Sequence, residues 1–103
     1  MIAEPMSLEM RKAAEKLADY AREDQPEIVR VLLFPSAEEL RLLYVDTAAH
    51  PGRVGEAIAP FYFRSTPEQG IPYSSAVALV RPDDVGQREL PLGWGQWADA
   101  ESI

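Results

Sequence analysis

Few side chains in this 103-residue sequence have the types and spacing that catalysis requires. His50 is the one histidine, and it could act as a general base together with Asp46 or a nearby serine. It precedes Pro51 and Gly52, which are turn formers, and no serine lies in the G-x-S-x-G pattern of a nucleophile elbow. We therefore favour a solvated or turn-forming histidine over a catalytic one.

The carboxylates of Asp83, Asp84 and Glu89 are the best candidates for a metal site, because hard cations such as Ca²⁺ and Mg²⁺ prefer oxygen ligands. They lack the spacing of a calcium-binding loop, and two aspartates after Pro82 are typical of a turn and a helix cap. The absence of cysteine excludes disulfides, thiolate zinc sites and cysteine nucleophiles. We predict no metal and no other cofactor, and we favour a protein that is not an enzyme.

Aromatic residues give the strongest functional signal, since six of the nine follow residue 60. Two interpretations remain open. The rings complete the core, with Trp94 and Trp97 folded back over the sheet. Alternatively, they form a patch that accepts a partner chain or a planar ligand, because Trp, Tyr and Arg often anchor interfaces. The candidate binding residues of that patch are Tyr62, Arg64, Tyr73, Arg81, Trp94 and Trp97.

The central element of the chain is an expected β-hairpin. Residues 28–34 and 40–46 are rich in aliphatic and aromatic side chains, and turn formers join them, which predicts two antiparallel strands. Strict alternation would place Val29, Val31 and Leu33 together on one face. Neither strand alternates between apolar and polar residues, so both faces must be covered. A single helix can cover only one, which leaves the tryptophan-bearing segment or a second molecule for the other.

Further elements surround this hairpin. Apolar residues recur with a helical period from Met6 to Ala21, and either Pro5 or Ser7 suits the start of the helix. Two further strands are expected at 61–65 and 75–81. A weaker one at 87–92 contains a proline.

Sequential strands are usually neighbours in a sheet. We therefore predict an α+β fold, with the N-terminal helix packed on an antiparallel three- to five-stranded meander sheet. Residues 1–103 should form a single globular domain, with 1–5 and 98–103 frayed.

The formal charge of −7, from 10 basic and 17 acidic residues, disfavours nucleic acid as a partner. No apolar run reaches the roughly 20 residues of a membrane helix, and the N-terminus does not resemble a signal peptide. We therefore expect a cytoplasmic protein that contacts neither nucleic acid nor membrane. The acidic excess follows residue 64, which indicates either a solubility feature or a basic partner.

Three functions are consistent with these observations. The first is a non-enzymatic protein-interaction or adaptor domain, whose partner is another protein or a second copy of the chain. The alternative is a small ligand-binding or enzymatic domain, with an aromatic pocket between the sheet and the Trp94–Trp97 segment. A third is an acidic mimic of nucleic acid, which requires carboxylates gathered on one face.

Overall fold

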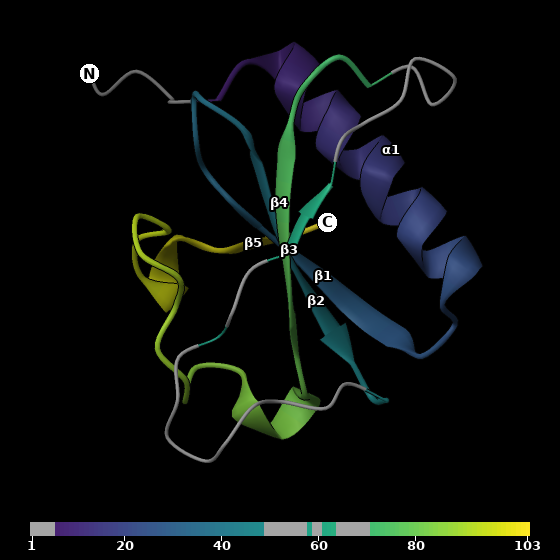
Figure 1. Cartoon of the computed structure of the whole chain (residues 1–103), viewed down its shortest axis with the longest axis vertical. Coiled ribbons are helices and arrows are strands. Elements are labelled where there is room, and N and C mark those ends of the chain that lie inside the picture. The colour runs from purple at the N-terminus through teal and green to yellow at the C-terminus, as the bar shows by residue number, and fades with distance from the viewer. Residues whose placement is uncertain (1–5, 49–57, 59–60, 64–70) are drawn as a thin grey trace.

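The chain folds around a mixed β-sheet that is covered on both faces. A computed structural model describes residues 6–48, 58 and 71–103, together with the backbone of 61–63. In these residues one α-helix and a five-stranded sheet form an α+β fold, as predicted. In Figure 1 the strands lie one behind another, with the helix on one side and the segment that follows β4 on the other. The domain thus has three layers.

Helix α1 spans Leu8–Asp24 and begins at Ser7, whose Oγ accepts a hydrogen bond of 3.1 Å from the backbone N–H of Met10. Ser7 is therefore the N-cap, and the alternative start at Pro5 lies outside the described residues. The buried side of the helix is rich in alanine. Small side chains let the helix lie close to β1 and β2, which it contacts. The buried residues of α1 are Met10, Ala13, Ala14 and Ala18.

Strands β1 (Ile28–Phe34) and β2 (Leu40–Asp46) pair antiparallel, with the bounds that the sequence predicts. The register shifts between Ile28 and Arg30, which is a β-bulge. Strict alternation is therefore wrong at the start of β1. Val29, expected on the same face as Val31, is 61% exposed, whereas Ile28 is buried in its place. The extra residue of the bulge reverses the face on which the strand begins.

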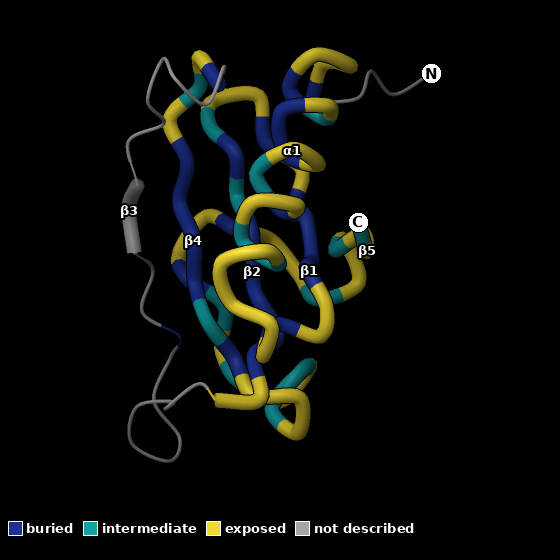
Figure 2. The backbone as a smooth tube through the Cα atoms, turned by 90° about the vertical axis from the view of Figure 1, so that its right-hand side faces the viewer, coloured by how far each residue is buried: buried dark blue, intermediate teal, exposed yellow. Residues whose placement is uncertain are grey.

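The strand order is β3-β4-β2-β1-β5, so the predicted antiparallel meander is wrong. Strand β4 (Ser75–Val80) lies parallel to β2, and β3 (Phe61–Phe63) pairs antiparallel with the outer side of β4. The side-by-side arrangement is visible in Figure 2. Strand β4 is apolar on both faces and is buried along most of its length, which favours an interior position over an edge. The predicted strand 61–65 extends beyond β3 into residues outside the described part.

The C-terminal residues are ordered, although we predicted that 98–103 would fray. Strand β5 (Glu101–Ser102) pairs with β1 opposite Leu32 and Leu33. Arg30 Nε also donates a hydrogen bond of 2.9 Å to Ser102 Oγ. The fifth strand is therefore this short edge strand and not the predicted strand 87–92, where the chain turns after the 3₁₀-helix η2 (Pro82–Asp84).

Two hydrophobic clusters lie on opposite faces of the sheet. The helix-side cluster contains Val31, Leu33 and Val77 among others, together with the buried residues of α1. The opposite cluster is formed by alternate residues of the same strands, by Ile58 and by one residue of the C-terminal segment. Its buried members are Leu32, Phe34, Leu43, Val45, Ile58, Ala76, Ala78, Val80 and Trp94. The segment after β4 therefore covers the face that the helix leaves open. Figure 2 shows the central strands buried along most of their length.

No helix in the described part of the chain is long and apolar enough to cross a membrane.

Candidate functional site

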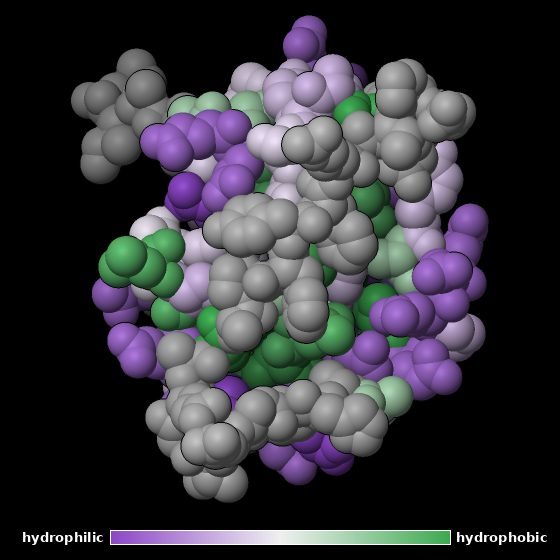
Figure 3. All heavy atoms as spheres, viewed as in Figure 1, coloured by the Kyte–Doolittle hydropathy of each residue, from purple (hydrophilic) through white to green (hydrophobic). Residues whose placement is uncertain are grey.

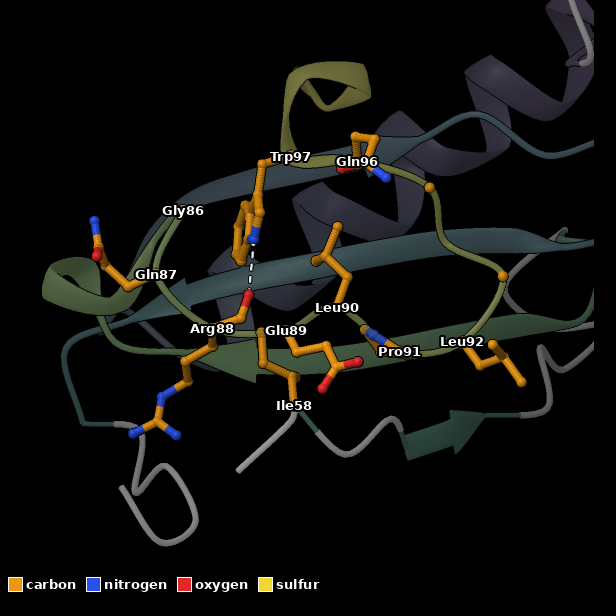
Figure 4. A pocket seen from close by; sticks show the side chains of 12 residues that line it. Ile58, Gly86, Gln87, Arg88, Glu89, Leu90, Pro91, Leu92, Gln96 and Trp97 are labelled. Atoms are coloured by element: carbon orange, nitrogen blue, oxygen red, sulfur yellow. Dashed lines mark hydrogen bonds between the residues drawn. The ribbon is translucent and has the colours of Figure 1, made fainter. Parts of the chain in front are cut away.

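An open groove of about 840 Å³ lies along the segment that covers the second face of the sheet. Its lining consists of Ile58, residues 86–93 and residues 95–97. Figure 4 shows the aliphatic side chain of Leu90 at its centre, the Trp97 indole on one side and Ile58 on the other. Figure 3 shows hydrophobic atoms in the lower middle of this view, over the sheet. The groove itself is lined by apolar side chains, such as Leu90 and Trp97, and by polar ones, and it is open to solvent.

Residues 82–99, here called the groove segment, are held on the sheet by two tryptophans that pack against one phenylalanine. The ring of Trp94 lies 5.4 Å from that of Phe34, centroid to centroid, and is tilted by 50°. The ring of Trp97 lies 6.3 Å from Phe34 in an edge-on arrangement at 71°. Phe34 and Trp94 are buried, and Trp97 is half-buried. Such aromatic pairs stabilise packing beyond the area that they bury.

Hydrogen bonds fix the backbone of the groove segment at three separate points. The indole Nε1 of Trp97 donates to the carbonyl oxygen of Arg88 at 2.8 Å, as the dashed line in Figure 4 shows. The backbone N–H of Ile58 donates to the carbonyl oxygen of Glu89 at 3.0 Å. Arg41 Nη1, from β2, donates to the carbonyl oxygen of Gly93 at 2.7 Å. The segment is therefore fixed along most of its length.

A tight turn from Pro91 to Trp94 presents Leu92 to solvent. The backbone N–H of Trp94 donates to the carbonyl oxygen of Pro91 at 3.1 Å, and Gly93 has a φ of +88°. A positive φ at the third residue alone is the signature of a type II turn, which favours glycine there. Leu92 occupies the second position, at the corner of the turn, and its side chain is fully exposed. Pro91 and Trp94 on either side of the turn are buried.

The charge of the groove is acidic. Residues 82–99 contain four carboxylates and a single guanidinium, that of Arg88. Arg88 Nε pairs with Asp84 Oδ2 at 3.3 Å, and its side chain is largely buried. Figure 4 shows the Arg88 guanidinium pointing away from Leu90, whereas the Glu89 carboxylate extends toward Pro91. Glu89 is exposed and forms no ion pair with any described residue.

The structure describes the side chains of four of the six residues that the sequence proposes as one patch, and these four lie on different parts of the sheet. Trp94 and Trp97 lie together over the second face. Tyr73 is half-buried and packs against the helix-side cluster, on the opposite face of the sheet. Arg81 is exposed and precedes η2. Arg64 and the side chain of Tyr62 lie outside the part of the chain that the structure describes.

Sequence reasoning missed Leu92, the most exposed large hydrophobic residue of the described chain, and the fixing role of Arg41. We expected a short strand through this region. The tripeptide Pro91-Leu92-Gly93 does contain a turn signal, since proline and glycine punctuate type II turns. No local signal connects Arg41 to Gly93, because the two residues lie 52 positions apart.

Within the described ranges, no three His, Asp or Glu residues lie close enough together to hold a metal ion. Asp84, one of the three carboxylates considered as ligands, pairs instead with Arg88. His50, the candidate general base, lies outside the described residues.

Comparison of the chain with protein-family models, with curated proteins and with solved structures finds no significant match.

Proposed function

We propose that this chain is a non-enzymatic protein-interaction domain that binds its partner with the groove and the adjoining turn at residues 91–94. One observation carries the proposal: the side chain of Leu92 is fully exposed on a turn whose flanking residues are buried and hydrogen-bonded. Single exposed leucines are common on protein surfaces. Here the leucine belongs to the lining of a groove that also contains Leu90 and Trp97.

Pre-organisation supports a binding role for this surface. The Trp97–Arg88, Ile58–Glu89 and Arg41–Gly93 hydrogen bonds hold the segment before any partner arrives. A partner then loses less free energy in ordering the loop than it would with an unconstrained loop. Full burial of one leucine side chain contributes about 1.5–3 kcal/mol, which corresponds to roughly tenfold to a hundredfold in affinity.

The proposal is tested by selecting binders of the full chain from a displayed library of random peptides. Selected peptides are then measured against Leu92→Ser and, as the matched control, Leu8→Ser. Leu8 is also an exposed leucine, 65% accessible, but lies at the start of α1 on the other side of the sheet. We expect Leu92→Ser to weaken binding about tenfold or more, with Leu8→Ser unchanged. Failure to enrich any peptide, or equal binding by Leu92→Ser, would overturn the proposal.

The partner under this proposal is another protein or a second copy of the chain. Light scattering at increasing protein concentration distinguishes the two. A dimer that Leu92→Ser dissociates identifies the second copy, whereas a monomer at every concentration leaves a different protein as the partner.

A small-molecule ligand is the second candidate, because the groove volume of about 840 Å³ lies within the range of ligand pockets. The half-buried Trp97 then reports on occupancy through its fluorescence. Small aromatic and aliphatic fragments are screened for a change in this emission. A change that occurs in wild type and is absent in Trp97→Phe favours the ligand site. Fragments that bind nowhere near the groove reject it.

The acidic mimic of nucleic acid receives no support from the described carboxylates. Exposed Glu15 and Glu23 lie on α1, whereas exposed Asp83 and Glu89 lie on the opposite side of the sheet. We do not propose that function further.

A further inference from the structure

We infer that the groove takes a peptide segment in which an apolar side chain lies beside a lysine or arginine. This inference rests on the proposed function and specifies the chemistry of the partner. It follows from two apolar side chains of the groove lining, Leu90 and Leu92, and from the charge of the residues around them.

The guanidinium groups of Arg88, in the groove segment, and of Arg41, which contacts it, are already paired with carboxylates. Arg88 pairs with Asp84 and is largely buried. Arg41 contacts Glu39 at 3.1 Å and Glu38 at 3.8 Å, and its side chain is only 16% exposed. Neither guanidinium is therefore presented to a partner as an accessible positive charge.

Within residues 82–99, which the structure describes, the accessible charge is negative. The Glu89 carboxylate lines the groove, is exposed, and extends toward Pro91 beside the apolar surface (Figure 4). Asp83 and Asp99, from the two ends of the segment, are also exposed. An acidic peptide would meet like charge, whereas a lysine or arginine next to the inserted apolar side chain would reach Glu89.

The exposure of these carboxylates to solvent limits how much an ion pair with them contributes to the affinity for a peptide. A single solvent-exposed ion pair contributes about 0.2–1 kcal/mol, or up to roughly fivefold in affinity, and salt weakens it. The apolar contact therefore determines most of the affinity. The charge determines which apolar segments are selected.

The experiment uses three displayed peptide libraries with the same randomised apolar centre. Pairs of lysines flank the centre in the first, pairs of glutamines in the second and pairs of glutamates in the third. The full chain is the bait, and the dissociation constants of the best binders are compared at low and at high salt. We expect the lysine-flanked peptides to bind about tenfold more tightly than the glutamate-flanked ones at low salt, with the difference reduced at high salt.

Two variants test whether the preference for lysine-flanked peptides arises from Glu89. We expect Glu89→Gln to lower the affinity of the lysine-flanked peptides about threefold. Glu23→Gln removes the same charge from the last turn of α1, on the other side of the sheet, and should leave the affinity unchanged.

The outcomes separate this inference from the proposed function. If glutamine- or glutamate-flanked peptides bind as tightly as lysine-flanked ones, or if Glu89→Gln and Glu23→Gln behave alike, the inferred chemistry is wrong while the binding function stands. If none of the libraries yields a binder, both fail.

Discussion

Arg41 on β2 donates a hydrogen bond of 2.7 Å from Nη1 to the carbonyl oxygen of Gly93, in the turn that presents Leu92. The same guanidinium donates from Nε to Glu39 at 3.1 Å. One side chain thus connects the central hairpin to the groove segment. The position of Leu92 consequently depends on a residue that does not itself line the groove.

Replacing Arg41 by alanine should weaken both folding and binding. We expect a loss of about 1–2 kcal/mol in the free energy of unfolding, because a hydrogen bond from a charged group is removed. Peptide affinity should also fall, since the turn is no longer fixed. Denaturant unfolding and fluorescence anisotropy measure the two effects. Arg41→Lys keeps the positive charge but lacks the planar guanidinium, so it should recover only part of the stability and part of the affinity. Unchanged affinity in Arg41→Ala would show that the turn is fixed by other contacts.

Substitutions of the two tryptophans should differ in their cost. Trp94→Ala removes a buried ring that packs on Phe34, so we expect a loss of about 3–5 kcal/mol in the free energy of unfolding. Trp97→Phe keeps a ring beside Phe34 but removes the hydrogen bond to the carbonyl of Arg88, and should cost about 0.5–1.5 kcal/mol. Urea titrations measure both losses. A loss in Trp97→Phe as large as that in Trp94→Ala would contradict this difference in burial.

Gly95 should tolerate substitution less well than Gly86. Both have positive φ values, +89° and +81°, so alanine is strained at either position. At Gly95 the added Cβ would also lie 2.8 Å from Asp99 Oδ2, an oxygen that accepts a hydrogen bond from the backbone N–H of Gln96. At Gly86 it meets no atom within 4 Å. We expect Gly86→Ala to cost about 1 kcal/mol and Gly95→Ala more. Thermal unfolding of the pair tests this, and a larger loss in Gly86→Ala would contradict the described contact.

Stability should decline at alkaline pH because of Tyr44. Burial raises the pKa of Tyr44 to about 12 from 10.0, and the nearby positive charge of Arg22 opposes part of that rise. The folded state therefore binds the phenolic proton more tightly than the unfolded state. The associated stability is fully present below pH 10 and is lost as the pH rises toward 12, by about 2–3 kcal/mol.

The control for this pH dependence is Tyr44→Phe, which retains the buried ring and lacks the titrating group. Other tyrosines and lysines titrate over the same range in both proteins. The free energy of unfolding of wild type should fall more steeply than that of Tyr44→Phe between pH 10 and 12. Parallel curves would contradict a raised pKa at Tyr44.

Local sequence patterns were sufficient to predict the helix and the central hairpin. Helical periodicity with a capping Ser7, and two apolar runs separated by Pro35, encode α1, β1 and β2 through short-range interactions. The parallel position of β4 beside β2 is encoded by burial on both faces, which only the complete sheet reveals. The ordered tail was also missed, because Glu101 and Ser102 pair with β1 mainly through backbone groups that any residue carries.

Among the six residues predicted to form a patch, Trp97 lines the groove, and Trp94 and Trp97 both lie over the second sheet face. The type of a residue does not indicate on which face of a sheet its side chain lies. Tyr73 was therefore grouped with the two tryptophans, although it packs on the helix side. Leu92 was overlooked because its exposure results from the turn, and hydropathy alone places a leucine in the core.

The most direct test of the binding surface is amide chemical-shift mapping by NMR. The isotope-labelled full chain is titrated with a peptide from the random-library selection, and the perturbed amides are located on the structure. We predict the largest changes between residues 86 and 97, around the groove, with the exposed side of α1 unaffected. Changes concentrated on α1, or scattered without relation to Leu92, would contradict the central claim that this turn and groove form the binding surface.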